Sequence, residues 1–235
     1  MWETLQLLSF GDGGWGDELL AGLKVTILLA LGTLPFGLAL GLIVALGQIS
    51  SELMVRRAAQ IYTTIFRGLP ELLTIFIVYF GGQMMLQKIA GLFTDAYVEV
   101  NAFAAGMLAL GLVFSSYASE VFLSAFRGIP DGQWEGADAL GLSRFQAFRL
   151  VILPQLIRLS IGGLGNLWLI LTKDTSLVSV IALNELLRQT TVAVGFTKQP
   201  ILFYSVACAI YLVLSLVSSR GLMAIEKRVN RGEAR

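Results

Sequence analysis

The chain has 235 residues, of which 56% are hydrophobic and 14% are charged, and its formal net charge is +1. The mean hydropathy of +0.76 excludes an ordinary soluble domain. The absence of histidine excludes catalytic triads and metal sites that need imidazole, and the single cysteine, Cys208, excludes an intrachain disulfide. No Gly-x-x-x-x-Gly-Lys-Ser/Thr loop occurs either. We therefore predict an integral membrane protein that is not itself a nucleotide-hydrolysing enzyme.

Five segments are long and apolar enough to cross a bilayer, which requires roughly 20 mostly apolar residues. They lie at about 21–46, 60–87, 101–125, 151–171 and 199–223. The predicted fold is all-α, with an extracytoplasmic segment at 1–20, a transmembrane domain at 21–225 and a cytoplasmic tail at 226–235. We expect no cleaved signal peptide, because no Lys or Arg precedes Lys24.

The basic residues indicate the orientation in the membrane. They concentrate after the first span, after the third span and at the C-terminal end, where the sequence has Arg56, Arg57, Arg67, Arg127, Arg144, Arg149, Arg158, Arg220, Lys227, Arg228, Arg231 and Arg235. The positive-inside rule places these segments in the cytoplasm. The N-terminus is then outside and the C-terminus inside, which agrees with five spans.

Glycine and proline mark two features of the first spans. Gly37 and Gly41 form a small-x-x-x-small spacing that allows another helix to approach closely. Gly68 and Pro70 interrupt the second span, because proline removes a backbone donor and glycine loosens the helix. Such a break in a membrane needs cover from protein or a water-filled cavity.

A polar loop at about 127–150 separates the third and fourth spans. Asp131 is the predicted N-cap of a short helix, and Gly141 fits the left-handed position that ends it. Ser143 and Gln146 have the spacing of a capping box that starts another helix. We predict a short cytoplasmic helix between two long ones.

Trp134, Ala137 and Leu140 recur along this short helix at helical spacing. They predict an apolar ridge that could seat in a cleft of another protein. The alternative is a membrane-surface helix that packs on its own bundle.

The fourth span ends in the polar run Lys173-Asp174-Thr175-Ser176. Ionisable groups at membrane depth usually face an interior pathway, because exposure to lipid costs several kcal/mol. Thr175 or Ser176 is also a predicted cap of a helix at about 176–190, whose N-terminal amides would point into the cavity.

The candidate pathway residues are Glu71, Glu120, Asn166, Lys173, Asp174, Thr175 and Ser176. Three carboxylates against one lysine predict an anionic cavity that suits a guanidinium or ammonium group. The alternative is that Lys173 and Asp174 pair with neighbouring helices and only brace the bundle, and that Glu120 pairs with an arginine at the cytoplasmic edge.

Several blocks in order resemble the polar-amino-acid branch of the ABC-importer permeases, and in particular permeases of histidine, basic amino acid and octopine/nopaline uptake systems. The blocks are Arg67-Gly68-x-Pro70, Tyr117-x-x-Glu120-Val121, Gly132-Gln133-x-Glu135, Leu140-Gly141, Leu153-Pro154-Gln155, Asn166 and Lys173-Asp174-Thr175-Ser176-Leu177-Val178-Ser179. They extend over most of the chain from about residue 20.

The resemblance implies a type I permease subunit of five transmembrane helices in the bacterial inner membrane. It implies a second permease, identical or a sister chain, two ATPase subunits that bind ATP and Mg²⁺, a periplasmic solute-binding protein, and a polar amino acid or opine as solute, with no cofactor in this chain and no nucleic acid. The short helix becomes the coupling helix that docks on an ATPase, with Gln133, Trp134, Glu135, Gly136, Ala137, Leu140 and Gly141 as its residues. Gly136 departs from the alanine usual in the family and lowers helix stability by roughly 1 kcal/mol.

Two other functions are compatible with the residues alone. An ion-coupled secondary transporter or channel would use the ionisable groups as an ion path, but the chain shows no inverted halves. An inert membrane anchor would explain the loop but gives Lys173 and Asp174 no purpose.

Overall fold

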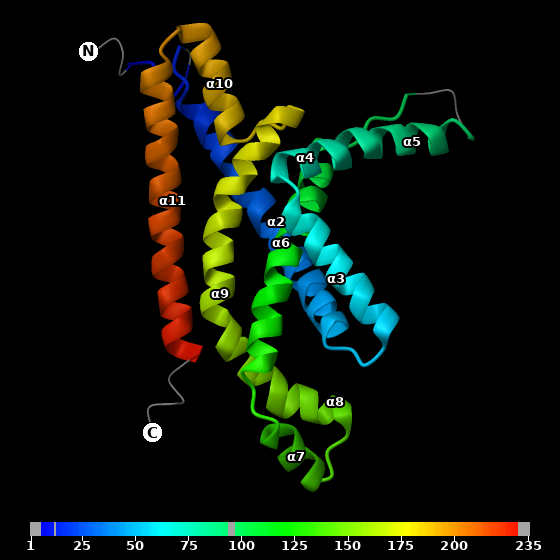
Figure 1. The fold of residues 1–235 in the computed structure, drawn as a ribbon. Coiled ribbons are helices and arrows are strands. Elements are labelled where there is room, and N and C mark those ends of the chain that lie inside the picture. The colour runs from blue at the N-terminus through cyan, green and yellow to red at the C-terminus, as the bar shows by residue number, and fades with distance from the viewer. Residues whose placement is uncertain (1–5, 12, 94–96, 230–235) are drawn as a thin grey trace.

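The computed structural model describes residues 6–11, 13–93 and 97–229, and every regular element among them is a helix (Figure 1). The α-helices are α2 (Gly16–Gln48), α3 (Leu53–Gly68), α4 (Glu71–Phe76), α5 (Gly82–Ala90), α6 (Ala102–Arg127), α7 (Gly132–Ala139), α8 (Arg144–Ala147), α9 (Leu153–Asp174), α10 (Leu186–Thr197) and α11 (Pro200–Val229). Two π-helical segments, η1 (Ile77–Gly81) and η2 (Phe148–Ile152), and one 3-10 helix, η3 (Thr175–Ile181), join some of them.

Five helical segments are long and apolar enough to cross a membrane, as predicted. They are Gly16–Gln48, Glu71–Ala90, Ala102–Arg127, Arg144–Ile181 and Pro200–Val229. The prediction of a second segment starting near residue 60 was wrong. α3 ends at Gly68, and a separate helix begins at Glu71 in a different direction (Figure 1). Pro70, which cannot donate a backbone hydrogen bond, lies in the extended link between them.

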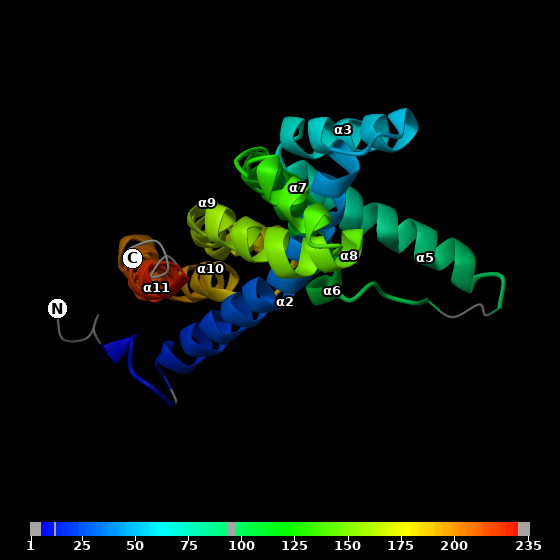
Figure 2. The same cartoon turned by 90° about the horizontal axis from the view of Figure 1, so that it is seen from below.

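α6 lies at the centre of the bundle, between α2 and α9, and contributes more buried side chains than any other described helix (Figures 1 and 2). Its buried face consists mostly of alanine, serine and glycine, which let helix backbones approach closely. The predicted small-x-x-x-small pair on α2 meets this face. A Cβ atom at Gly41 would lie 2.9 Å from the Ala118 Cβ and 3.0 Å from the Ser115 carbonyl oxygen.

We expect Gly41→Leu to prevent α2 and α6 from packing, because the nearest atoms are the Ala118 Cβ and two α6 backbone atoms, none of which can rotate away. Overpacking of this kind costs about 3 kcal/mol or more. The measurement is the thermal unfolding midpoint and the yield of monodisperse protein in detergent. Gly221→Leu on α11 is the control, because nothing lies within 4 Å of a Cβ at that glycine. Equal stability of the two variants would contradict the prediction.

The two ends of the bundle differ in charge. The α2–α3 link, α7, α8 and the end of α11 lie at the lower end in Figure 1, whereas α10 and the described N-terminal residues lie at the upper end. The lower end carries Arg56, Arg57, Arg127, Arg144, Arg149, Lys227 and Arg228. The fold thus gathers three basic segments, separate in sequence, at one end.

Candidate transport pathway and coupling helix

The predicted short helix is present as α7, and its flanking turns follow the local rules. Gly141 has a φ of +72°, which confirms the left-handed end. The Gln146 amide donates to the Ser143 Oγ at 3.4 Å and the Ser143 amide donates to the Gln146 Oε1 at 2.9 Å, which confirms the capping box. The predicted Asp131 cap was wrong: its side chain makes no capping bond, because its backbone is already helical at φ −56° and ψ −32°.

The apolar ridge of α7 is divided between two faces. Ala137 is buried and Trp134 packs against the core of the chain, whereas Leu140 is 80% exposed. The prediction of one continuous ridge was wrong, because Trp134 and Ala137 face the core of the chain itself and only Leu140 is open to a partner. Gln133 faces α9, where its Oε1 accepts a 3.0 Å hydrogen bond from Gln155. The surface open to another protein therefore contains Glu135, Gly136, Leu140 and Gly141.

A cavity of about 200 Å³ contains two of the predicted pathway carboxylates. Glu71 is the first residue of α4 and Asp174 is the last residue of α9, and both line it together with Tyr117 of α6. The rest of the lining is apolar: Leu110, Val113, Phe114, Leu167, Ile170 and Leu171. Two acidic side chains thus meet at one cavity whose described lining contains no basic residue.

The other predicted pathway residues on α9 and η3 do not line this cavity. Lys173 and Asn166 are exposed elsewhere on α9. Thr175 is fully buried and donates to the Thr172 carbonyl at 2.9 Å, and Ser176 is half-buried in η3. Neither caps a helix at 176–190, so that prediction was wrong; a 3-10 helix occupies 175–181 and α10 begins only at Leu186.

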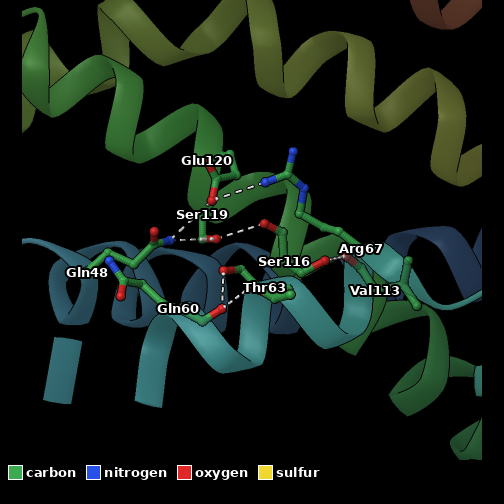
Figure 3. A network of polar contacts seen from close by, with 9 residues as sticks. Gln48, Gln60, Thr63, Arg67, Val113, Ser116, Ser119 and Glu120 are labelled. Atoms are coloured by element: carbon green, nitrogen blue, oxygen red, sulfur yellow. Dashed lines mark hydrogen bonds and ion pairs between the residues drawn. The ribbon is translucent and has the colours of Figure 1, made fainter. Parts of the chain in front are cut away.

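Glu120 lies in a second polar group, formed where α3 approaches α6 (Figure 3). Its Oε1 is 3.2 Å from Arg67 Nη1, the only ion pair among the residues that the structure describes. Gln48 Nε2 lies 3.5 Å from the same oxygen. The Arg67 guanidinium carbon is also 5.8 Å from the centre of the Tyr117 ring. Pairing of Glu120 with an arginine was the alternative interpretation, and the structure shows that contact.

Lys173 and Asp174 do not brace the bundle by ion pairs within the described part of the chain. Tyr117 was quoted in a motif but not predicted as a pathway residue, although its position one helical turn before Glu120 placed it on the same face. Arg67 was not predicted as a pathway residue either, because it was treated as part of the helix break.

Glu185 is a buried structural carboxylate that the sequence analysis did not select. It is fully buried and caps α10 by accepting from the Leu187 amide at 2.9 Å and the Arg188 amide at 2.7 Å. Tyr211 of α11 donates to it at 3.1 Å. Burial raises the pKa of Glu185, and the backbone and Tyr211 donors oppose that shift. The carboxyl group therefore joins α10 to α11 next to α2, where Thr26 accepts from the Leu186 amide.

We expect Glu185→Ala to lower the free energy of unfolding by about 2–4 kcal/mol, because it removes a cap and leaves buried donors without an acceptor. Glu185→Gln should cost less, since one acceptor oxygen remains. Thermal unfolding in detergent measures both. Glu52→Ala is the matched control, because Glu52 occupies the N-cap position of α3 without a side-chain bond. A Glu185→Ala midpoint equal to that of Glu52→Ala would refute the capping role.

Comparison with known proteins agrees with this architecture. Residues 37–231 match the family model described as the binding-protein-dependent transport system inner membrane component. The nopaline transport system permease protein of Agrobacterium fabrum is 43% identical over 230 residues, covering 97% of this chain and 98% of that protein. The chain belongs to this permease family. The arginine ABC transporter permease protein of Escherichia coli K12 is 38% identical, with 90% of this chain and 94% of that protein covered.

Solved structures show the same fold. A crystal structure of an amino acid ABC transporter with histidines has a TM-score of 0.78 and 30% identity, covering 91% of the permease and 95% of that chain. An inward-facing methionine ABC transporter has a TM-score of 0.72 at 16% identity. The permease therefore has the type I ABC-importer fold that the resemblance implied.

These relatives also decide between the classes of function. The permease is a membrane component of an ABC import system. The ion-coupled carrier and the inert anchor find no support among the relatives. The roles of the individual pathway and coupling residues remain predictions.

Proposed function

We propose that this permease imports a cationic amino acid or an opine, delivered by a periplasmic binding protein and driven by partner ATPases. The observation that carries the proposal is the meeting of Glu71 and Asp174 at one cavity without a basic side chain in its described lining. Relatives named for nopaline, octopine and arginine transport support the same solute class.

The cavity can select a solute by both its charge and its shape. A guanidinium or ammonium group pairs with carboxylates through charge-assisted hydrogen bonds, which are stronger than neutral ones. The apolar side chains of Leu110, Val113 and Leu171 exclude water around that pair and contact the aliphatic stem. A neutral or anionic solute would leave two carboxylates close together without a counter-ion, which is unfavourable.

The proposed contact with an ATPase is the exposed surface on and just after α7. It consists of Glu135, Gly136, Leu140 and Gly141. Ala137 is buried and Gln133 bonds to Gln155, so a force on the exposed surface of α7 reaches η2 and α9. ATP and Mg²⁺ are bound by the ATPase partners, and closure of their dimer turns the cavity outward. Hydrolysis returns it to the inward-facing state.

The basic end of the bundle supports an orientation in the membrane, and α5 supports an assembly with a second permease. The basic lower end, with α7 and the end of α11, faces the cytoplasm, and α10 faces the periplasm. We therefore propose that 1–20 lies outside and that 226–235 lies in the cytoplasm of an inner-membrane protein. None of the residues of α5 is buried within the chain, which supports a second permease subunit, identical or a sister chain, beside it.

The test is the ATPase activity of the reconstituted complex in lipid, with permease, ATPase and binding-protein partners. We expect binding protein loaded with a cationic amino acid or opine to stimulate hydrolysis, and protein loaded with acidic or apolar amino acids to leave it at the basal rate. Stimulation by the acidic amino acids alone would refute the solute class. Failure of the chain to bind any ATPase would refute the importer assembly.

A further inference from the structure

Arg67 is bound as proteins bind a free guanidinium group. Its Nη1 lies 3.2 Å from the Glu120 Oε1 (Figure 3). Its guanidinium carbon lies 5.8 Å from the centre of the Tyr117 ring. A carboxylate at the edge and an aromatic ring at the face are the two contacts that favour guanidinium over other cations. Both groups come from α6, whereas Arg67 comes from α3.

The acceptor is positioned without help from Arg67. Gln48 of α2 donates to Glu120 at 3.5 Å and to the Ser119 Oγ at 3.4 Å. Ser119 in turn donates to the Ser116 carbonyl at 2.7 Å, within the fully buried core of α6. The carboxylate therefore belongs to the packed α2–α6 pair. Arg67, in contrast, is the penultimate residue of α3, just before the Gly68–Pro70 break.

Solvent reaches this contact. The Arg67 and Glu120 side chains are 44% and 36% exposed. They line a polar cavity of about 690 Å³ together with Gln48, Gln60, Thr63, Thr64, Gly68 and Tyr117. An ion pair this exposed is weak, because water screens the charges and both side chains lose freedom. A second cation in the cavity can therefore exchange with Arg67.

This cavity and the one that contains Glu71 and Asp174 are adjacent at Tyr117, which lines both. Glu120 is one helical turn further along α6, toward the end that bears α7. We propose that Glu120, Gln48 and the Tyr117 ring form a guanidinium-binding site that Arg67 occupies as a tethered competitor, and that the solute cation displaces Arg67 on its way to the cytoplasm. This inference rests on the proposed cationic solute.

The tethered cation has two consequences for transport. Arg67 neutralises the charge of Glu120 when no solute is present, so the carboxylate always has a counter-ion. It also returns to Glu120 after each solute passes, which keeps the site from retaining its cargo. The apparent affinity for the solute is lowered by the fraction of time that Arg67 occupies the site.

Binding of methylguanidinium to the permease–ATPase complex in nanodiscs tests the site, measured by calorimetry without binding protein. A background with Glu71→Gln and Asp174→Asn leaves Glu120 as the remaining pathway acceptor. In it, Arg67→Gln should tighten binding about tenfold if Arg67 occupies the site nine-tenths of the time. Glu120→Gln should abolish binding, and the gain should vanish in Arg67→Gln/Glu120→Gln. An unchanged or weaker affinity of Arg67→Gln, or a gain that survives loss of Glu120, would overturn the proposal.

Two further variants keep the test decisive. Arg57→Gln, on the same helix and without an ion pair in the described structure, should leave methylguanidinium affinity unchanged. Arg67→Lys keeps a tethered cation but loses the planar fork, so its affinity should fall between those of the parent and Arg67→Gln. This comparison keeps the test decisive even if the neutral variant fails to assemble, because an affinity equal to the parent's refutes a site that prefers guanidinium, and an affinity weaker than the parent's refutes the competition. A parent importer that transports no cationic solute refutes the proposed function instead, since the methylguanidinium series reports on the site alone.

Discussion

Replacing Leu140 by aspartate should reduce binding-protein-stimulated ATPase activity and solute uptake about thirtyfold or more. Leu140 is 80% exposed at the end of α7, and it offers the proposed docking surface its large apolar side chain. An apolar anchor of this kind contributes about 2 kcal/mol or more to a protein–protein contact, which corresponds to a factor of about 30. Uptake in proteoliposomes and affinity of the ATPase for the detergent-solubilised permease are the two measurements.

Controls separate docking from folding in this experiment. Leu140→Met keeps an apolar side chain of similar size and should retain most of the activity. Ala137→Asp introduces a charge at a buried position of the same helix, so it should lower the unfolding midpoint, whereas Leu140→Asp should not. Normal coupled ATPase activity in Leu140→Asp would rule out this surface as the docking site.

Local features around α7 were predictable because a few adjacent residues determine them. Gly141 is the residue that adopts a left-handed conformation at low cost, and the side chains of Ser143 and Gln146 satisfy each other's backbone amides. The helix break at Pro70 was predictable for the same reason. Asp131 shows the limit of such rules, since its type suits a cap but its own backbone is in a helical conformation and its side chain makes no capping bond.

Contacts between distant segments were outside the reach of the sequence pattern. Glu71 and Asp174 were both selected because they are ionisable groups in apolar surroundings, yet their meeting at one cavity depends on how α4 and α9 pack against α6. The same packing decided that Lys173, adjacent to Asp174, is exposed elsewhere. The change of direction after Gly68 and the hydrogen bond from Tyr211 to Glu185 also depend on packing between helices, because neither leaves a periodic signal in the sequence.

The meeting of Glu71 and Asp174 leads to the largest expected loss of transport. Glu71→Gln/Asp174→Asn should reduce uptake of a cationic solute about a hundredfold or more, because each hydrogen bond to a charged group contributes about 1.5–3 kcal/mol. Uptake at saturating loaded binding protein, together with the solute concentration dependence, measures the effect. ATPase docking should be unchanged, since neither residue lies near α7.

The single variants make this result specific to a shared ligand. If both carboxylates contact one cation, their effects should not add, and the double-mutant cycle should give a coupling energy different from zero. Glu52→Gln, at an exposed position at the start of α3, removes the same charge without touching the cavity and should transport normally. Independent, additive losses would mean that the two carboxylates serve different steps. Undiminished uptake in the double variant would show that the solute does not bind in this cavity. Glu120 would then be the remaining acidic residue proposed to bind the solute during transport.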